Sequence, residues 1–320
     1  MTQIRSLTQP TRRPGELGVH SLNYFAVETP DLVTEKRFYE SFGLNVSEQG
    51  DGLRLHTEGS ANAWAAVVGG LQRKLHHLSF GVFEDDLLPF KRHLERAGVP
   101  LLDAPSGFES NGLWFRDQDG TYVEICVAEK TSPNFKASAL FPSTPGGKAA
   151  APKRSQAGFV KPKRLAHILL FAKDVSKAVE FYSRVLGLRL SDRSGEQIAF
   201  MHGMHGSDHH MVAFVKSEGP GLHHSSWDVP ALNDVGIGAM QMADRGFSQG
   251  WGLGRHVLGS NYFHYIRDPW GSYAEYSCDI DYIPVDVDWE AGDHEGHDAF
   301  YVWGPTPPAD FGVNHELTQP

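Results

Sequence analysis

The strongest constraint on the fold is that the sequence repeats itself. Residues 115–126 (FRDQDGTYVEIC) match residues 266–277 (IRDPWGSYAEYS), with Arg, Asp, Gly, Tyr and Glu in register. Residues 75–82 (LHHLSFGV) likewise match residues 222–229 (LHHSSWDV). Since the order is kept and the spacings differ by only a few residues, we predict two tandem copies of one domain.

Each copy itself contains two similar units. Strand-like segments that begin near Leu22, Leu75, Leu165 and Leu222 are each followed by a helical pattern and then by further strands. The predicted helices cover residues 34–42, 84–97, 176–186 and about 231–245. One βαβββ unit cannot bury both faces of its sheet alone. We therefore predict an α+β fold of two tandem domains, each made of two paired βαβββ units that form a half-open barrel.

The predicted domains are separated and followed by segments of different composition. The first copy covers residues 18–130 and the second residues 164–282, while residues 131–163 are rich in Pro, Gly, Ala and Lys and contain no acid. This composition is typical of a linker. Residues 283–320 contain no Lys or Arg but several acids and aromatics. Such a tail should dock, either as a lid over the barrel mouth or as a subunit contact.

Charge and hydropathy argue against several functional classes. The net charge of -10 disfavours a surface that follows nucleic-acid phosphates. No apolar run reaches the ~20 residues of a membrane helix, and the first residues lack the apolar segment of a secretory signal. We predict a cytoplasmic protein that binds neither nucleic acid nor membrane. The 17 histidines stand out, because imidazole is a common ligand for divalent metals near neutral pH.

Residues 261–278 predict a β-hairpin with its turn around Asp268 and Gly271. Glu275 falls inside the second strand, between apolar and aromatic neighbours. A buried carboxylate needs a partner, either a cation or a metal. Tyr265 lies just before the turn, so the hairpin should bring it to the strand next to Glu275. An exposed glutamate on an edge strand is the simpler alternative for this stretch alone.

Symmetry between the units suggests a metal site in the second copy. His167 lies in the first strand of its first unit, His224 in the first strand of its second unit, and Glu275 in the last strand of that unit. Equivalent strands of two paired units should point their inward side chains at one centre. Two imidazoles and one carboxylate form the facial triad that suits non-haem Fe(II) and leaves positions open; Mn(II) accepts the same ligands.

These residues, with SDHHMVAF at 207–214 and GRHVLGSNYFHYIRDPWGSYAEYS at 254–277, resemble the type I extradiol ring-cleaving dioxygenases of the vicinal oxygen chelate superfamily. The resemblance extends over roughly residues 18–282. It implies that iron is bound by His167, His224 and Glu275, that His210 is the acid-base residue, and that His256 and Tyr265 contact the bound ring oxygens. It also implies a homo-oligomer that opens a catechol with O2 and releases a hydroxymuconic semialdehyde-type product.

The first copy lacks one of the three predicted ligands. His77 and Glu124 stand at the places of His224 and Glu275, but Tyr24 stands where the second copy has His167. Two ligands of three make a poor site. We therefore interpret the first copy as degenerate and structural, with its histidine and glutamate bonded to each other.

The substrate is predicted from one departure from the family pattern. In homoprotocatechuate-type relatives an arginine shortly before the equivalent of His256 contacts the substrate carboxylate, and Trp251 takes that place here. The resemblance then favours a catechol with a neutral alkyl, aryl or hydroxyl substituent. Phe200, Trp251 and Phe247 are the predicted pocket residues.

Two other functions remain as alternatives to ring cleavage. A glyoxalase-like isomerase or lyase of the same superfamily usually needs a fourth ligand, a carboxylate in the strand at 210–216, and HMVAFVK has none. A binding module that sequesters small molecules would lack the triad. Ring cleavage would consume oxygen with a catechol and give a yellow product, whereas an isomerase would act on a thiol adduct without oxygen.

Overall fold

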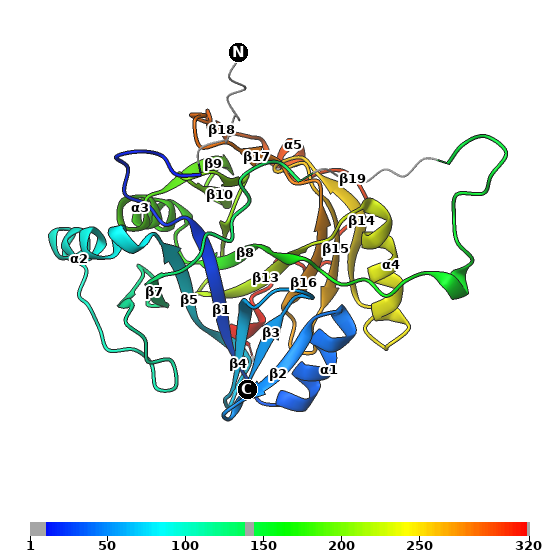
Figure 1. The fold of residues 1–320 in the computed structure, drawn as a ribbon, viewed down its shortest axis with the longest axis horizontal. Coiled ribbons are helices and arrows are strands. Elements are labelled where there is room, and N and C mark those ends of the chain that lie inside the picture. The colour runs from blue at the N-terminus through cyan, green and yellow to red at the C-terminus, as the bar shows by residue number, and fades with distance from the viewer. Residues whose placement is uncertain (1–10, 138–143, 319–320) are drawn as a thin grey trace, which may run out of the picture.

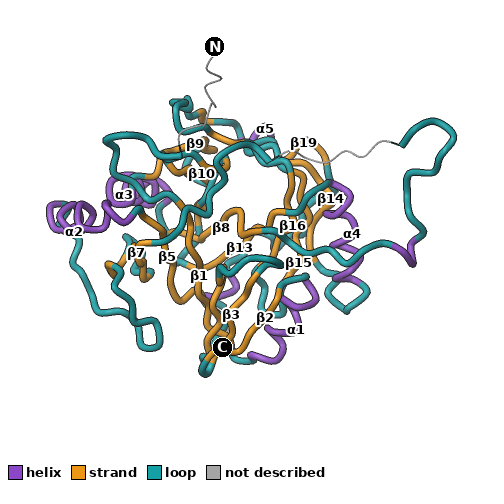
Figure 2. The backbone as a smooth tube through the Cα atoms, in the orientation of Figure 1, coloured by secondary structure: helices purple, strands orange, loops and turns teal. Residues whose placement is uncertain are grey.

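The computed structural model describes residues 11–137 and 144–318. Its strands form two large sheets, one from each copy, and the main helices lie on the outside of the strands (Figures 1 and 2). The predicted α+β architecture of tandem barrels is therefore confirmed.

The first copy forms a seven-stranded sheet with the order β2-β3-β4-β1-β5-β7-β6. Its strands are β1 (Ser21–Thr29), β2 (Asn45–Gln49), β3 (Gly52–His56), β4 (Ala63–Gly69), β5 (Lys74–Val82), β6 (Leu113–Arg116) and β7 (Tyr122–Val127). Its helices are α1 (Leu32–Phe42), the 3-10 turn η1 (Glu84–Asp86) and α2 (Leu87–Arg96).

The second unit of this copy departs from the predicted βαβββ pattern. Where a strand is expected between α2 and β6, the described chain makes a single β-bridge between Leu102 and Trp114. Pro100 and Pro105 fall in this segment. Because proline lacks the N–H that a ladder needs, these two residues limit pairing in this segment.

The second copy forms a ten-stranded sheet with the order β18-β9-β10-β12-β8-β13-β16-β15-β14-β19. Its strands are β8 (Arg164–Ala172), β9 (Leu188–Ser194), β10 (Ile198–Gly203), β12 (Val212–Lys216), β13 (Gly221–Asp228), β14 (Gly250–His256), β15 (Tyr262–Arg267), β16 (Tyr273–Cys278), β18 (Gly292–Asp293) and β19 (Tyr301–Trp303). The short strands β11 (Ser207–Asp208) and β17 (Tyr282–Ile283) pair separately. The helices are η2 (Arg154–Gln156), α3 (Val175–Leu186), α4 (Leu232–Ala243), α5 (Gly296–Ala299) and η3 (His315–Leu317).

The helix ends follow local capping signals. The Asp31 carboxylate accepts hydrogen bonds from the first backbone N–H groups of α1, and Asp174 does the same for α3. Gly43 and Gly187 end these helices in the left-handed conformation, with φ of 101° and 71°. Both helices begin slightly earlier than predicted, because the capping aspartates lie directly before them.

The strand order brings the first strands of the paired units together. β8 pairs antiparallel with β13, β13 parallel with β16, and β16 antiparallel with β15. In this register His167 lies opposite Ser226, Ser226 opposite Glu275, and Glu275 opposite Tyr265. Directly paired residues point to the same face of a sheet. The four side chains therefore form one row across one face, and the predicted hairpin is confirmed.

The two copies share a buried interface. The rings of Phe42 and Tyr276 stack at 3.9 Å, and the tyrosine hydroxyl donates to the Phe42 carbonyl at 2.8 Å. The buried guanidinium of Arg73 lies 3.5 Å from the carboxylate of Glu35 and 3.2 Å from that of Asp268. Since Asp268 starts the turn of the β15–β16 hairpin, Arg73 of the first copy helps to hold this turn in place.

The tail after residue 282 lies on the second copy. β18 pairs with β9 at one edge of the sheet and β19 pairs with β14 at the other. Tail residues, among them Phe300 and Phe311, also line the cavity of the second barrel. The two alternatives for the tail, a lid or a subunit contact, stay predictions. The domain boundaries 18–130 and 164–282 stay a prediction. None of the helices in the described chain combines the length and the apolar character needed to cross a bilayer.

Candidate metal centre

His167, His224 and Glu275 meet inside the second barrel. Their potential ligand atoms lie within 4.8 Å of one another, and all three side chains are buried. Oε2 of Glu275 is 3.3 Å from Nε2 of His167 and 3.7 Å from Nε2 of His224. Fold symmetry thus gathers three residues from distant strands, as the sequence pattern predicts.

The hydrogen bonding of this cluster fits a divalent metal. Nε2 of His224 and Oε2 of Glu275 are buried and make no hydrogen bond to any described residue. Leaving a buried polar atom unsatisfied costs about 1–3 kcal/mol, and more for a charged group. A metal bound between them would offset that cost. Two imidazoles and a carboxylate suit Fe(II) or Mn(II) and leave coordination positions for other ligands.

Asn261 orients the carboxylate of Glu275. Its amide nitrogen donates to Oε1 of Glu275 at 3.1 Å and to Oγ of Ser277 at 3.0 Å. With Oε1 occupied in this way, Oε2 faces the two histidines. The role of Asn261 could not be predicted from the sequence, because its contact depends on the turn between β14 and β15 and not on any motif.

His256 and Tyr265 form a hydrogen-bonded pair beside the cluster. Nδ1 of His256 lies 2.9 Å from the carbonyl oxygen of Phe300, so this nitrogen carries the proton. Nε2 of His256 then accepts from the hydroxyl of Tyr265 at 2.9 Å. Burial, reinforced by the nearby Glu275, raises the pKa of Tyr265 well above its ordinary value. The tyrosine therefore keeps its proton at neutral pH.

His210 lies on the other side of the cluster. Its ring centre is 4.1 Å from that of His167 and 4.9 Å from that of Phe200. Burial, together with the adjacent His167 and His209, lowers the pKa of His210 well below its ordinary value. A neutral imidazole in this position can act as a proton acceptor.

A chain of hydrogen bonds behind His210 determines which of its nitrogens is free. Nδ1 of His210 lies 3.0 Å from Nδ1 of His209, and Nε2 of His209 lies 2.8 Å from Oδ2 of Asp192. The carboxylate must accept, so a His209 ring with one proton carries it on Nε2, and its Nδ1 then accepts from Nδ1 of His210. Nε2 of His210 is left with its lone pair. Neither the role of His209 nor that of Asp192 follows from a sequence motif, because their contact joins residues 17 positions apart.

In the first copy, the residues at the equivalent positions form hydrogen bonds with one another. Tyr24 lies opposite Ser79, and Ser79 opposite Glu124, as His167, Ser226 and Glu275 do in the second copy. The hydroxyl of Tyr24 lies 3.0 Å from Nε2 of His77 and 3.4 Å from Oε2 of Glu124, which also accepts from Ser79 at 2.5 Å. The expected direct bond between this histidine and glutamate is therefore wrong in detail, because the tyrosine hydroxyl joins them.

Comparison with known proteins identifies the family. Residues 164–276 match the family model described as Glyoxalase/Bleomycin resistance protein/Dioxygenase superfamily. Over 307 residues, the chain is 47% identical to metapyrocatechase 2 from Cupriavidus necator, covering 96% of this chain and 95% of the relative. The chain belongs to the extradiol dioxygenases of the vicinal oxygen chelate superfamily. The predicted family is confirmed, and the chain is an enzyme.

Solved structures show the same fold at low sequence identity. A single-residue variant of homoprotocatechuate 2,3-dioxygenase from Brevibacterium fuscum has a TM-score of 0.74 at 18% identity, covering 95% of this chain and 84% of that one. The Mn(II)-bound glyoxalase from Novosphingobium aromaticivorans has a TM-score of 0.72 at 22% identity, covering 91% and 93%. Since this fold occurs both in a dioxygenase and in a glyoxalase, the substrate and mechanism of this enzyme must be inferred from the residues of its site.

The cluster of the dioxygenase opens into a cavity of about 450 Å³. Most of its lining is apolar, and it includes Leu169, Ile198 and Phe200 from the barrel and Phe300, Pro308 and Phe311 from the tail. No Lys or Arg side chain of the described residues lines it. Phe200 therefore lies where the sequence predicts a pocket residue, and the tail forms one wall of the cavity.

Trp251 does not line this cavity, contrary to the sequence expectation. It lies opposite Tyr265 in the β14–β15 pairing, and its ring stacks on the tyrosine ring with an interplanar angle of 10°. Its Nε1 donates to the Pro305 carbonyl at 2.7 Å, which buries the indole beneath the tail. Trp251 thus supports Tyr265 from behind. Its position relative to His256 could not show that the tail covers it.

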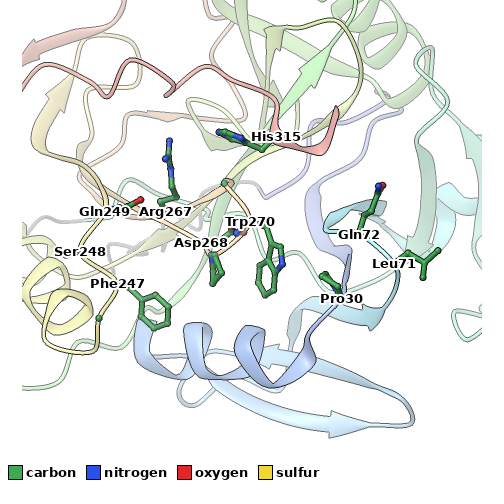
Figure 3. Close-up of a pocket in the computed structure, with 13 residues that line it drawn as sticks. Pro30, Leu71, Gln72, Phe247, Ser248, Gln249, Arg267, Asp268, Trp270 and His315 are labelled. Atoms are coloured by element: carbon green, nitrogen blue, oxygen red, sulfur yellow. Dashed lines mark hydrogen bonds between the residues drawn. The ribbon is translucent and has the colours of Figure 1, made fainter. Parts of the chain in front are cut away.

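Phe247 lies away from the metal cluster. It lines a separate cavity of about 740 Å³ near the junction of the two copies, together with Trp270 and Gln249, as Figure 3 shows. Its ring packs edge-on against Phe38 of α1, with the centroids 5.1 Å apart. The chain turns toward α1 directly after α4. The predicted contact of Phe247 with substrate is therefore not supported.

Proposed function

We propose that this enzyme opens the ring of neutral, substituted catechols next to the diol, using O2 and an Fe(II) held by His167, His224 and Glu275. The observation that carries the proposal is that Nε2 of His224 and Oε2 of Glu275 are buried without a hydrogen-bond partner among the described residues, next to an apolar cavity that His224 lines. Mn(II) fits the same donors and is the alternative metal. A bound ferrous ion supplies the redox chemistry that lets O2 react with an aromatic ring and lowers the pKa of a coordinated phenol.

The side chains around the cluster supply proton transfer and orientation. His210 would take a proton from a catechol hydroxyl at its free Nε2 and return it to the oxygen that becomes the product carboxyl group. The Tyr265 hydroxyl, held by His256, would contact the neighbouring ring oxygen. Phe300 and Phe311 keep water away from the ring. The product would be a hydroxymuconic semialdehyde or its ketone analogue.

The cavity supports the predicted substrate class. A carboxylate buried in an apolar cavity without a cation costs several kcal/mol. Because no Lys or Arg of the described residues lines this cavity, a neutral alkyl or aryl substituent fits it better than an acidic one. The glyoxalase-like alternative is not favoured, since β12 carries no acidic residue at the place of a fourth ligand. A cytoplasmic location stays a prediction from the apolar pattern of the sequence, and a homo-oligomer stays a prediction of the family resemblance.

The proposal is tested on Fe(II)-loaded protein with a panel of catechols. We expect oxygen uptake and a yellow product with catechol, 3-methylcatechol and 2,3-dihydroxybiphenyl. For 3,4-dihydroxyphenylacetate we expect a kcat/KM at least about 100-fold lower, in line with the cost of burying its charge. Oxygen electrode and absorbance measurements check both. No oxygen uptake with any catechol would contradict ring cleavage, and a preference for the acidic compound would contradict the substrate class.

The hydrogen-bond chain behind His210 gives a second test. Asp192→Asn should lower kcat by about 100-fold or more, because an amide can donate to His209 and reverse the tautomers that free Nε2 of His210. We expect KM and metal content to stay near wild type, with partial recovery in Asp192→Glu.

The matched control for the Asp192 variants is Asp293→Asn. The carboxylate of Asp293 accepts from the Gly195 backbone on the same side of the barrel but makes no contact with His209. Its kcat should stay near wild type. A normal kcat in Asp192→Asn, or an equal loss in Asp293→Asn, would show that the chain does not position His210.

A further inference from the structure

Three pairs of consecutive histidines share one geometry. The Nδ1 atoms of the two rings lie 2.7 Å apart in the pair 76–77, 3.0 Å in 209–210 and 2.8 Å in 223–224. Within each contact one Nδ1 must donate and the other accept. The first histidine of a pair therefore influences the tautomer of the second. The second histidine is a proposed metal ligand in one pair alone, the pair 223–224.

The hydrogen-bond partner of His223 on the side away from His224 determines which nitrogens of the two rings carry protons. Nε2 of His223 lies 2.8 Å from the backbone carbonyl oxygen of Phe311. A carbonyl oxygen can only accept, so Nε2 carries the proton and Nδ1 carries the lone pair. Nδ1 of His224 then donates to it, and Nε2 of His224 is bare. This bare nitrogen is the atom that faces Glu275 at 3.7 Å.

Phe311 belongs to the C-terminal tail, and tail residues before and after it bind to the rest of the protein. The neighbouring Asp310 pairs with Arg267 at 2.6 Å. Further along, the half-buried carboxylate of Glu316 accepts hydrogen bonds from the backbone N–H groups of Leu75 and Leu222 at 3.0 and 2.8 Å. The second contact lies on β13, two residues before His224. The Phe311 ring itself packs on His223, with the centroids 4.8 Å apart.

We propose that His223 is a positioning residue that couples docking of the C-terminal tail to retention of the metal. With the tail docked, the carbonyl of Phe311 holds His223 in the tautomer that frees Nε2 of His224 for coordination. With the tail undocked, His223 loses this acceptor, and His224 can carry its proton on the ligating nitrogen. Coupling of this kind is reciprocal, so bound metal also holds the tail in place. The inference rests on the proposed metal site but not on ring cleavage.

The direct test measures Mn(II) affinity of the metal-free, full-length protein by titration calorimetry. His223→Phe keeps a ring of similar size but removes both nitrogens. We expect its dissociation constant for Mn(II) to rise about 10- to 100-fold, the usual effect of losing a hydrogen-bond partner of a metal-binding histidine. His223→Asn places an oxygen acceptor near the former Nδ1 and should recover part of the affinity.

The matched control is His76→Phe, which alters the corresponding pair in the first copy. His76 contacts His77 in the same way, but no metal cluster is found around that pair among the described residues. This variant should bind Mn(II) like wild type. Wild-type affinity in His223→Phe, or an equal loss in His76→Phe, would overturn the coupling. A wild-type protein that binds no Mn(II) would overturn the metal site as well.

Hydrogen exchange gives a second readout that does not depend on affinity. In the wild-type chain, Mn(II) should slow amide exchange across residues 308–317. In His223→Phe at saturating Mn(II), this protection should be lost, while exchange in β8 and β13 stays slow. Slow exchange in β8 and β13 also shows that the variant is folded. Equal protection of the tail in both proteins would mean that His223 does not connect it to the metal.

Discussion

Glu275→Gln should remove tight metal binding and, with it, ring cleavage. The carboxylate is the one negatively charged group in the cluster of described residues, and its Oε2 is buried without a hydrogen-bond partner there. Glutamine keeps the shape, and its carbonyl oxygen can still accept from Asn261, but the charge that attracts a divalent cation is lost. Because losing an outer-sphere partner alone weakens metal binding about 10- to 100-fold, we expect a loss of more than about 100-fold here. Metal analysis after anaerobic loading and desalting measures it, beside oxygen uptake with a catechol.

The first copy provides the control for this experiment. Glu124 occupies the equivalent place in its own sheet, opposite Ser79, but accepts hydrogen bonds from serine and tyrosine hydroxyls. Glu124→Gln should therefore keep the metal content and the turnover of wild type, even if its melting temperature falls. Metal retained in Glu275→Gln would refute the proposed ligand set. Metal lost equally in both variants would point to a general folding defect.

The repeat predicted the placement of the metal cluster because symmetry acts at long range. His167 and Glu275 are separated by more than a hundred positions, and no local motif contains both. Pairing of the first strands of two units puts β8 beside β13, and the strand period of two then sends both side chains to one face. The same reasoning correctly set Tyr24 of the first copy in the place of His167.

What the sequence could not predict depends on tertiary packing, in part that of the tail. Trp251 and Phe247 are both aromatic residues of the second copy, yet one is covered by Pro305 and the other packs against α1. Nothing in residue type distinguishes these surroundings from a pocket wall. The partners of His209 and His223, an aspartate on β9 and a tail carbonyl, likewise follow from tertiary contacts across long separations.

His210→Ala should lower the rate of ring opening without releasing the metal. His210 is buried beside His167, but its side chain is not one of the three clustered ligands, and its Nδ1 is occupied by His209. Removing a positioned acid-base group typically costs about 10²–10⁴ in rate, and we expect kcat to fall within that range. The metal content and the KM for catechol should stay close to wild type. His93→Ala, which alters a histidine on α2 outside the cavity lining, is the control for the general effect of losing an imidazole.

Added imidazole sharpens the test of His210. The alanine variant leaves a gap next to the cavity, so free imidazole at millimolar concentration should restore part of kcat, whereas it should not affect Glu275→Gln. Single-turnover absorbance measurements on Fe(II)-loaded protein follow product formation directly. Turnover unchanged by His210→Ala would remove the residue from the reaction. Loss of the metal in that variant would instead mean that His210 holds the cluster together, because a group that only moves a proton can be deleted without emptying the site.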